Sequence, residues 1–293
     1  MSNNELVRVN LPMLIKLAQP AASLKLLNSR IRSVQNGRYL SVSKGRGMEF
    51  DEIRPYQMGD DIRTIDWRVT ARTGKTHTKL FREERERPVF ISVDYRASMQ
   101  FATRGVFKAV QAAKLAALLA WVAQHQGDKV GGQVFTDYAC QEIKPQNGKQ
   151  AVLHFLNNLV KKPPLADNNL NFTDHLKRLV QHVKSGSLVY IISDFRGLNA
   201  AAEKLLSNLA RHCELVLIFI YDPLEISLPK QGRYRVIHQQ TTLNVDTTNK
   251  QGMAAYQLKF QQHRDYLQQL AIKLNSRLLE CSSIDNPVTI LRQ

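Results

Sequence analysis

The stretch Leu188-Val189-Tyr190-Ile191-Ile192, followed at once by Ser193-Asp194, decides the fold of this chain. A short apolar run closed by polar residues is typical of a strand that is buried on both faces. Residues 89–93 form a similar run that ends at Asp94, and residues 215–221 form another that ends at Asp222. These three runs predict strands of one sheet, each followed by an aspartate.

Helical spacing of apolar residues separates the predicted strands. Helices are predicted over residues 103–126, 150–160, 173–183, 200–211 and 253–274, and further strands over residues 129–135, 234–237, 242–245 and 277–281. Strands that alternate with helices indicate a parallel sheet covered on both faces. We therefore predict an α/β fold with a doubly wound, mostly parallel sheet.

The first part of the chain has a different character. Residues 5–33 have helical spacing that is broken near Pro20, residues 45–74 are dense in charge and glycine, and residues 76–86 alternate like a strand with one wet face. We predict two domains: an N-terminal helical and charge-dense segment over residues 1–86, and the α/β domain over residues 87–293.

Composition narrows the class of protein. Of the 293 residues 43% are apolar, which is ordinary for a globular protein, and no stretch approaches the roughly 20 apolar residues that span a bilayer. The N-terminus lacks a secretory pattern. Three widely spaced cysteines (Cys140, Cys213 and Cys281) suit reduced thiols rather than disulfides or zinc. We expect a soluble cytoplasmic protein that meets a membrane only through partners.

The net charge of +16 indicates that binding to acidic partners has to be considered. The excess is spread along the chain, without a basic block and without aromatic residues interleaved among basic ones. This pattern favours a generally basic surface over a nucleic-acid groove. A nucleic-acid-binding protein, whose binding would fall steeply as salt rises, remains the alternative.

Aspartates at the ends of parallel strands predict a site. The ligand crevice of an open α/β sheet lies at the carboxyl ends of its strands, so Asp94 and Asp194 could face one another there. Aspartate also caps helices, which is the structural interpretation of each one alone.

No cysteine lies beside a histidine, and His175 and His182 are predicted on a solvated helix face. The sequence predicts a binding protein and no enzyme; a Mg²⁺-dependent hydrolase using both aspartates lacks a general base.

The residues after the first strand carry a resemblance. Asp94-Tyr95-Arg96-Ala97-Ser98-Met99, together with Thr173 and Asp194, resembles the metal-ion-dependent adhesion site of von Willebrand factor A domains. The resemblance implies that Asp94, Ser98, Thr173 and Asp194 bind Mg²⁺ through oxygen atoms, leaving one position for a partner's acidic side chain. It also places these four residues, with Arg96, at the partner-binding surface.

Arg96 departs from the motif, because that position carries a hydroxyl ligand in the family. A guanidinium is a permanent cation and would repel Mg²⁺. Two alternatives follow: Arg96 points away, or it fills the place of the metal as a partner for Asp94 and Asp194. In either case an arginine could receive a partner's carboxylate directly, in bidentate fashion.

The preceding segment is similar to the signature of the bacterial "domain of unknown function fifty-eight" family. The matching residues are Glu49-Phe50, Arg54-Pro55-Tyr56, Gly59-Asp60-Asp61, Asp66-Trp67 and Ala71-Arg72. This resemblance implies a degenerate von Willebrand A domain and partnership with a MoxR-type AAA+ ATPase in assembling or activating other proteins.

Charges of both signs alternate along this signature segment. We favour a structural interpretation, in which paired charges form a partly buried network with Tyr56 and Trp67 as apolar anchors. The functional interpretation makes the same segment a docking surface.

Overall fold

The computed structural model describes residues 3–26, 48–83, 87–161, 170–228, 232–238, 241–246 and 250–292. The chain forms two compact units, of which the larger combines Met1–Arg30 with Arg87–Gln293 and the smaller is Ile31–Glu86. The division after residue 86 falls where the sequence predicts it. The first 30 residues, however, belong to the larger unit, which corrects the predicted domain of residues 1–86.

The N-terminal helices join the larger unit because they bury apolar surface against its core. Helix α2 (Leu11–Lys16) contributes Leu14, which is fully buried, and helix α3 (Ala18–Ala21) contributes Ala21. The indole Nε1 of Trp121 donates a hydrogen bond to the Leu14 carbonyl at 3.1 Å. A buried indole needs such an acceptor, so this contact fixes the N-terminal helices in place.

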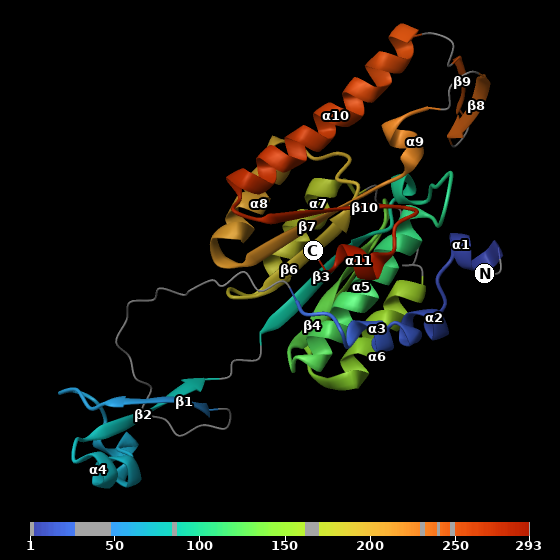
Figure 1. Ribbon diagram of the computed structural model, residues 1–293. Helices are drawn as coiled ribbons and strands as arrows, with labels where there is room; N and C mark the ends of the chain where they lie inside the picture. The colour runs from blue at the N-terminus through green and yellow to red at the C-terminus, as the bar shows by residue number, and fades with distance from the viewer. Residues whose placement is uncertain are drawn as a thin grey trace. The chain divides into compact units, whose positions relative to one another are not determined.

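A six-stranded sheet forms the centre of the larger unit, in the order β10-β7-β6-β3-β4-β5 (Figure 1). Its strands are β3 (Pro88–Asp94), β4 (Lys129–Phe135), β5 (Cys140–Gln146), β6 (Leu188–Ser193), β7 (Glu214–Tyr221) and β10 (Arg277–Ser282). All neighbours pair in parallel except β4 and β5. This confirms the predicted mostly parallel sheet. The strand order reverses between β3 and β6, so these neighbours flank the topological switch point.

Strand β5 is an antiparallel edge strand that the sequence analysis did not identify. Its side chains are largely half-buried or exposed, so it lacks the apolar run that marked the other strands. It contains Pro145, which an edge position tolerates because proline has no N–H to give to a neighbouring strand.

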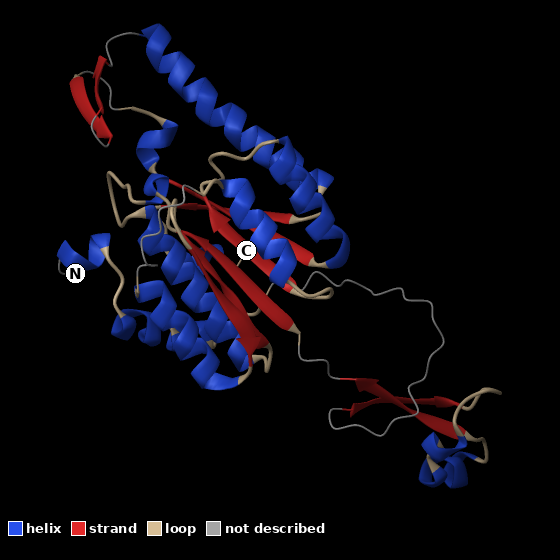
Figure 2. Cartoon of the chain, turned by 180° about the vertical axis from the view of Figure 1, so that it is seen from behind, coloured by secondary structure: helices blue, strands red, loops and turns tan. Residues whose placement is uncertain are grey.

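Helices cover both faces of the sheet, as Figure 2 shows. On β3, Val89, Ile91 and Val93 point into one core and Phe90 points into the other. The first core is covered by α5 (Lys108–His125) and α6 (Gly148–Val160). The second is covered by α7 (Phe172–His182), α8 (Ala200–His212) and α10 (Lys250–Lys273).

The remaining elements of the larger unit are short. They are α1 (Asn3–Val7), η2 (Ala97–Met99), α9 (Pro223–Ile226), the antiparallel pair β8 (Arg233–His238) and β9 (Thr241–Asp246), and α11 (Pro287–Ile290). The pair β8 and β9 matches the two short strands predicted before the long helix.

The described residues of the smaller unit form a two-stranded sheet with two short helical segments. Strand β1 (Met48–Pro55) pairs antiparallel with β2 (His77–Glu83), and η1 (Ile62–Thr64) and α4 (Trp67–Thr73) lie between them in the chain. Helix α4 begins at a side-chain cap and ends at Gly74, whose φ of 68° is the left-handed conformation that glycine adopts at little cost.

Candidate functional site

Two adjacent strands end side by side at the carboxyl edge of the sheet. Strand β3 ends at Asp94, and β6, which pairs with it in parallel, ends at Ser193 and is followed by Asp194. Arg96 Nη2 lies 2.7 Å from Asp94 Oδ2 and 3.7 Å from Asp194 Oδ1. The two predicted aspartates therefore face the same cation, at the switch point of the sheet.

Asp94 is completely buried and saturated with hydrogen bonds. Its oxygens accept from the Arg96 backbone N–H at 2.9 Å, from Arg96 Nε at 3.0 and 3.1 Å, and from Nη2 at 2.7 Å. The Ser193 hydroxyl donates a further bond at 2.6 Å. Burial raises the pKa of the Asp94 carboxyl, and the Arg96 charge works against that rise. Arg96 is thus the main partner that makes a buried carboxylate tolerable here.

Arg96 turns inward and takes the place between the aspartates. Its side chain is 9% exposed, and Nη1 donates to the Arg196 carbonyl at 2.9 Å. The guanidinium also lies 4.8 Å from the centre of the Phe172 ring, which is within range of a cation–π interaction. Of the two alternatives that the sequence left open, the structure shows the second. Because its Nε and Nη2 edge is occupied by Asp94, that edge is not free for a partner's carboxylate.

A lysine that the sequence analysis did not select completes the site. Lys108, the first residue of α5, is fully buried; its Nζ lies 3.1 Å from Asp194 Oδ2 and 2.9 Å from Glu225 Oε1. Arg196 Nη2 reaches the same Glu225 oxygen at 2.6 Å. Burial opposes ionisation of Asp194, but the charge of Lys108 and the hydrogen bond from the Arg196 backbone N–H outweigh it and hold the pKa of that carboxyl below its usual value.

We call these six residues the charged cluster. Its members are Asp94, Arg96, Lys108, Asp194, Arg196 and Glu225. Three carboxylates face two arginines and one lysine, so the charges of the ionised side chains balance within the cluster. Arg196 is its most exposed member, with 59% of its side chain open to solvent.

The other two predicted site residues lie at the same edge. Ser98 lies in η2, directly after Arg96 and Ala97, and its buried hydroxyl makes no hydrogen bond to the described residues. Thr173, in the first turn of α7, is nearly buried, and its hydroxyl donates to Asn199 Oδ1 at 3.2 Å. The structure thus brings Asp94, Arg96, Ser98 and Asp194 together, whereas Thr173 bonds to the cap of α8.

His175 is fully buried, which corrects its predicted place on a solvated helix face. Its ring stacks on Phe135, with ring centres 4.3 Å apart. Burial, together with the nearby charge of Arg96, lowers the pKa of His175 to about 4. The imidazole is therefore neutral near pH 7 and packs beneath the charged cluster. His182 does lie exposed, with Nε2 2.8 Å from Glu142 Oε2.

The third strand-end aspartate serves the fold. Asp222 accepts hydrogen bonds from the Thr103 N–H at 2.9 Å and from the Ser283 hydroxyl at 2.8 Å, and it caps α9 through the Leu224 N–H at 2.9 Å. This is the capping role that the sequence offered as the structural interpretation.

The arrangement does not fit a divalent metal ion. Mg²⁺ takes about six oxygen ligands, so the carboxylates must turn their lone pairs toward it. Both Asp94 oxygens instead face Arg96 and Ser193, and Asp194 Oδ2 faces Lys108. Among the described residues no group of three or more His, Cys, Asp or Glu side chains could hold a metal. The predicted ligand set Asp94, Ser98, Thr173 and Asp194 is therefore not assembled as a metal site.

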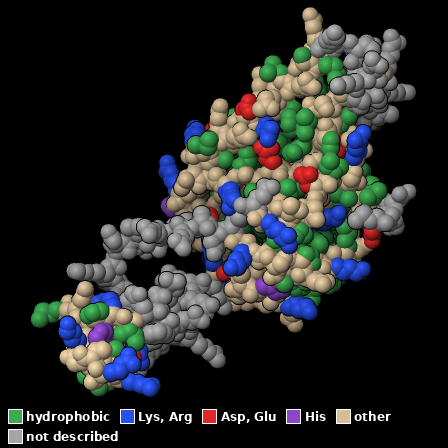
Figure 3. Space-filling view, in the orientation of Figure 1, with side chains coloured by type: hydrophobic (Ala, Val, Ile, Leu, Met, Phe, Trp, Pro, Cys, Tyr) green, Lys and Arg blue, Asp and Glu red, His purple; other side chains and the backbone are tan. Residues whose placement is uncertain are grey.

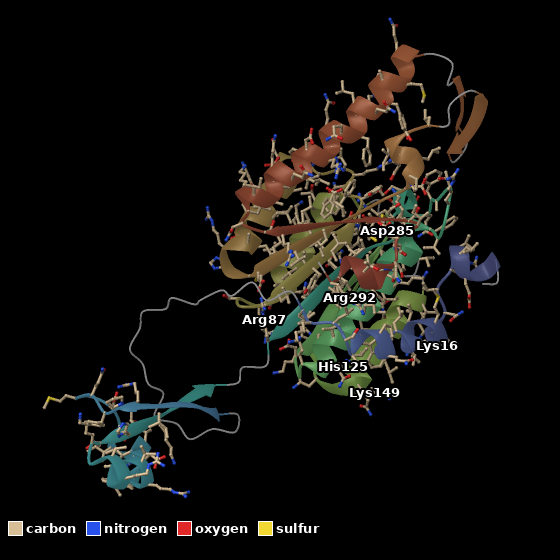
Figure 4. All side chains as sticks on the ribbon, viewed as in Figure 1. Lys16, Arg87, His125, Lys149, Asp285 and Arg292 are labelled. Carbon is tan, nitrogen blue, oxygen red and sulfur yellow. The ribbon has the colours of Figure 1, made fainter. Side chains whose placement is uncertain are left out.

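An apolar cavity of about 460 Å³ lies beside the charged cluster. Tyr95, Ala97 and Gln100, from the loop that carries Arg96, form one wall, and Arg8 and Val9 from the N-terminal segment form another. Ala97, Gln100 and Arg196 are exposed at this edge. The opposite, amino edge begins near Arg87, which precedes β3 and pairs with Glu214 (Figure 4).

Three acidic residues of the signature segment, Asp60, Asp61 and Asp66, bond within the segment or to the neighbouring strand β2. Asp60 pairs with Arg54 at 2.7 Å, Asp61 caps η1, and Asp66 caps α4 while lying 3.4 Å from Lys79. This agrees with the structural interpretation of the acidic residues. Trp67, predicted as an apolar anchor, is instead 67% exposed.

The arginines of this segment do not all fit the structural interpretation, in which charges pair with one another. Arg54 is paired with Asp60, whereas three others face solvent. Arg63, Arg68 and Arg72 are exposed, and within the described ranges no ion pair shorter than 4 Å involves them. On the larger unit, Figure 3 shows Lys and Arg side chains scattered over the visible face rather than gathered in one patch.

The fold and the edge site define the class: a doubly wound α/β protein with a charged site at the switch point of its sheet. The family described as "Protein of unknown function DUF58" matches residues 52–266, and the chain belongs to this family. This confirms the family that the signature segment resembles.

The relatives carry no assigned activity in their names. An uncharacterized protein of Mycobacterium bovis, Mb1516, and one of Mycobacterium tuberculosis, Rv1480, are each 30% identical over 219 residues, spanning 74% of this chain and 69% of the relative.

Solved structures with similar folds include two of interest. One is an aerotolerance-related membrane protein from Bacteroides fragilis, with 14% identity, coverage of 70% of this chain and 94% of that one, and a TM-score of 0.48. The other is a von Willebrand factor type A protein from Catenulispora acidiphila, with 13% identity, coverage of 50% of this chain and 35% of that one, and a TM-score of 0.33.

Within the described part of this chain, no helix combines the length and apolar character needed to cross a membrane.

Proposed function

We propose that the chain is a non-enzymatic adaptor that binds a partner protein at the carboxyl edge of its sheet. The observation that carries the proposal is the charged cluster, in which all six charged groups pair with one another and one of them, Arg196, also reaches solvent. Buried charges fix geometry at a cost in desolvation, which makes a rigid platform for a contact surface. A DUF58 protein with this fold suits a role in protein interaction.

The chemistry of the partner follows from the exposed residues. Arg196 pairs with Glu225 through Nη2, but 59% of its side chain is exposed, and a guanidinium has five N–H donors, so others are left for a partner's carboxylate. The apolar cavity lies at the same edge and is lined by Tyr95 and Ala97. A partner segment that carries an acidic side chain next to an apolar one would use both features. Arg196, rather than the predicted Arg96, then receives the carboxylate.

The proposed partner is a MoxR-type AAA+ ATPase, as the family resemblance implies, and the adaptor acts with it in assembling or activating other proteins. The proposal places this work in the cytoplasm, with contact to membranes only through partners.

Several chemical features support a role without catalysis. His175, beside the site, is buried and neutral, so it is not presented to a substrate. Burial raises the pKa of Cys140 and Cys281 to about 12, which leaves these thiols protonated and poorly nucleophilic. The carboxylates of the charged cluster are engaged with cations.

The test is co-purification of the tagged chain from its native cells, with and without ATP, and mass spectrometry of what accompanies it. We expect an AAA+ ATPase whose recovery is lost in Arg196→Glu. The matched control is Arg211→Glu, which makes the same charge change at an exposed residue in the last turn of α8. Equal recovery with both variants would place the interface elsewhere, and recovery of nucleic acid in place of protein would favour the charge-driven alternative.

A further inference from the structure

We infer that the carboxyl edge is a cation-independent counterpart of a metal-ion-dependent adhesion site, in which Arg96 and Lys108 permanently supply the positive charge that a divalent ion would bring. The inference deepens the proposed function, on which its meaning for partner binding rests. Its test needs no partner.

The first support is the position of the two cations. Arg96 stands where the motif carries a hydroxyl, and its guanidinium makes three contacts of 2.7–3.1 Å with both oxygens of Asp94. The Lys108 ammonium lies 3.1 Å from Asp194 Oδ2. Each strand-end carboxylate thus has its own cation at hydrogen-bonding distance. A divalent ion between the aspartates would have to displace groups that are covalently tethered there.

The second support is the balance of charge. The buried part of the cluster holds Asp94 and Asp194 against Arg96 and Lys108, and Lys108 is shared with Glu225. Adding a divalent ion would leave two uncompensated positive charges. Like charges a few ångströms apart repel strongly where water is excluded, and Asp94 and Lys108 are both 0% exposed at their side chains.

The third support is that the cations also hold neighbouring elements. Arg96 Nη1 donates to the Arg196 carbonyl in the loop after β6, and Lys108 links α5 to α9 through Glu225. These bonds connect the ends of β3 and β6 with two helices. The edge is therefore organised before any ligand arrives, which lowers the ordering cost of binding.

The experiment is a titration of the purified chain with Mn²⁺, a paramagnetic substitute for Mg²⁺, in which electron paramagnetic resonance measures free Mn²⁺. The proteins are the wild type, Asp94→Asn, Arg96→Ser, Arg96→Ser with Asp94→Asn, and the control Arg178→Ser. Arg178 is a half-exposed arginine on α7 that pairs only loosely, at 3.9 Å, with Glu142. Circular dichroism checks that each variant is folded.

We expect no Asp94-dependent Mn²⁺ binding in the wild type or in Arg178→Ser, and no change in the melting temperature of the wild type with EDTA. Arg96→Ser restores the hydroxyl of the motif and removes one cation, so it should bind about one Mn²⁺ per chain. Asp94→Asn should abolish that binding.

Two results would overturn the inference. One is near-stoichiometric binding of Mn²⁺ by the wild type that Asp94→Asn removes, a measurement that does not depend on whether Arg96→Ser folds. The other is a folded Arg96→Ser chain that binds no more Mn²⁺ than the wild type, because the guanidinium would then not be what excludes the ion. Neither result bears on Arg196 as the partner contact, so failure here is distinguishable from failure of the proposed function.

Discussion

Replacing Asp94 with asparagine should destabilise the larger unit by about 3–5 kcal/mol, the usual cost of breaking a buried ion pair from one side. Asp94 accepts four hydrogen bonds from Arg96 and one from Ser193, and it is 0% exposed. The substitution keeps the shape of the side chain but removes its charge. The guanidinium then remains buried, and Asp194, at 3.7 Å, is the one carboxylate among the described residues left within 4 Å of it.

The assay is urea unfolding at pH 7 of the wild type, Asp94→Asn, Arg96→Met and the double variant. The double variant removes both charges, so it should recover part of the loss, and the cycle should give a coupling free energy of about 2 kcal/mol or more. A loss below about 1 kcal/mol in Asp94→Asn, or purely additive effects, would refute the account of the charged cluster. The same reasoning excludes Asp94→Ala as a clean test of partner binding, because it perturbs the fold.

Three further predictions concern other residues. His175 has a pKa of about 4 in the folded protein, below the unfolded value of about 6.5, so its contribution to stability is present above pH 6.5 and is lost as the pH falls toward 4. The free energy of unfolding should therefore drop by about 3 kcal/mol over that range. Urea titrations at several pH values measure this drop, and His175→Phe should remove it. Cys140 and Cys281 should resist iodoacetamide at pH 8 in the native protein and react in urea, as peptide mass mapping can show. Rapid native labelling would contradict the raised pKa of both thiols and the burial of Cys281. Asp66→Ala, which removes the cap of α4, should lower the protection of the smaller unit in hydrogen exchange by about 1 kcal/mol, whereas Trp67→Ala, at an exposed position, should change it by less than about 0.5 kcal/mol.

The fold could be predicted from the sequence for those elements whose burial requires a regular pattern of apolar residues. Strands β3, β6 and β7 are buried along almost their whole length, so their apolar runs were visible, and α6, α7 and α8 each have one apolar face. Strand β5 was missed because an edge strand exposes one side and tolerates Pro145. The N-terminal helices were assigned to the wrong unit because helical spacing shows that a face is buried but not what covers it.

The site could be predicted as far as its strand-end aspartates. Asp94 and Asp194 follow buried strands, and parallel pairing brings the ends of β3 and β6 together. The burial of Lys108 could not be predicted, because a lysine at the start of an Ala- and Leu-rich helix is expected to be exposed to solvent. Its burial becomes intelligible only once α9 brings Glu225 opposite it. His175 was placed on the wrong face for a similar reason, since its partner ring Phe135 lies 40 positions earlier on β4.

The central claim is that a partner docks at the carboxyl edge of the sheet. Hydrogen–deuterium exchange of the chain, with and without the co-purified ATPase and ATP, tests it most directly. We predict added protection in residues 95–101 and 195–200, which carry Arg96 and Arg196. Protection confined to other segments, with these two unchanged, would contradict the account.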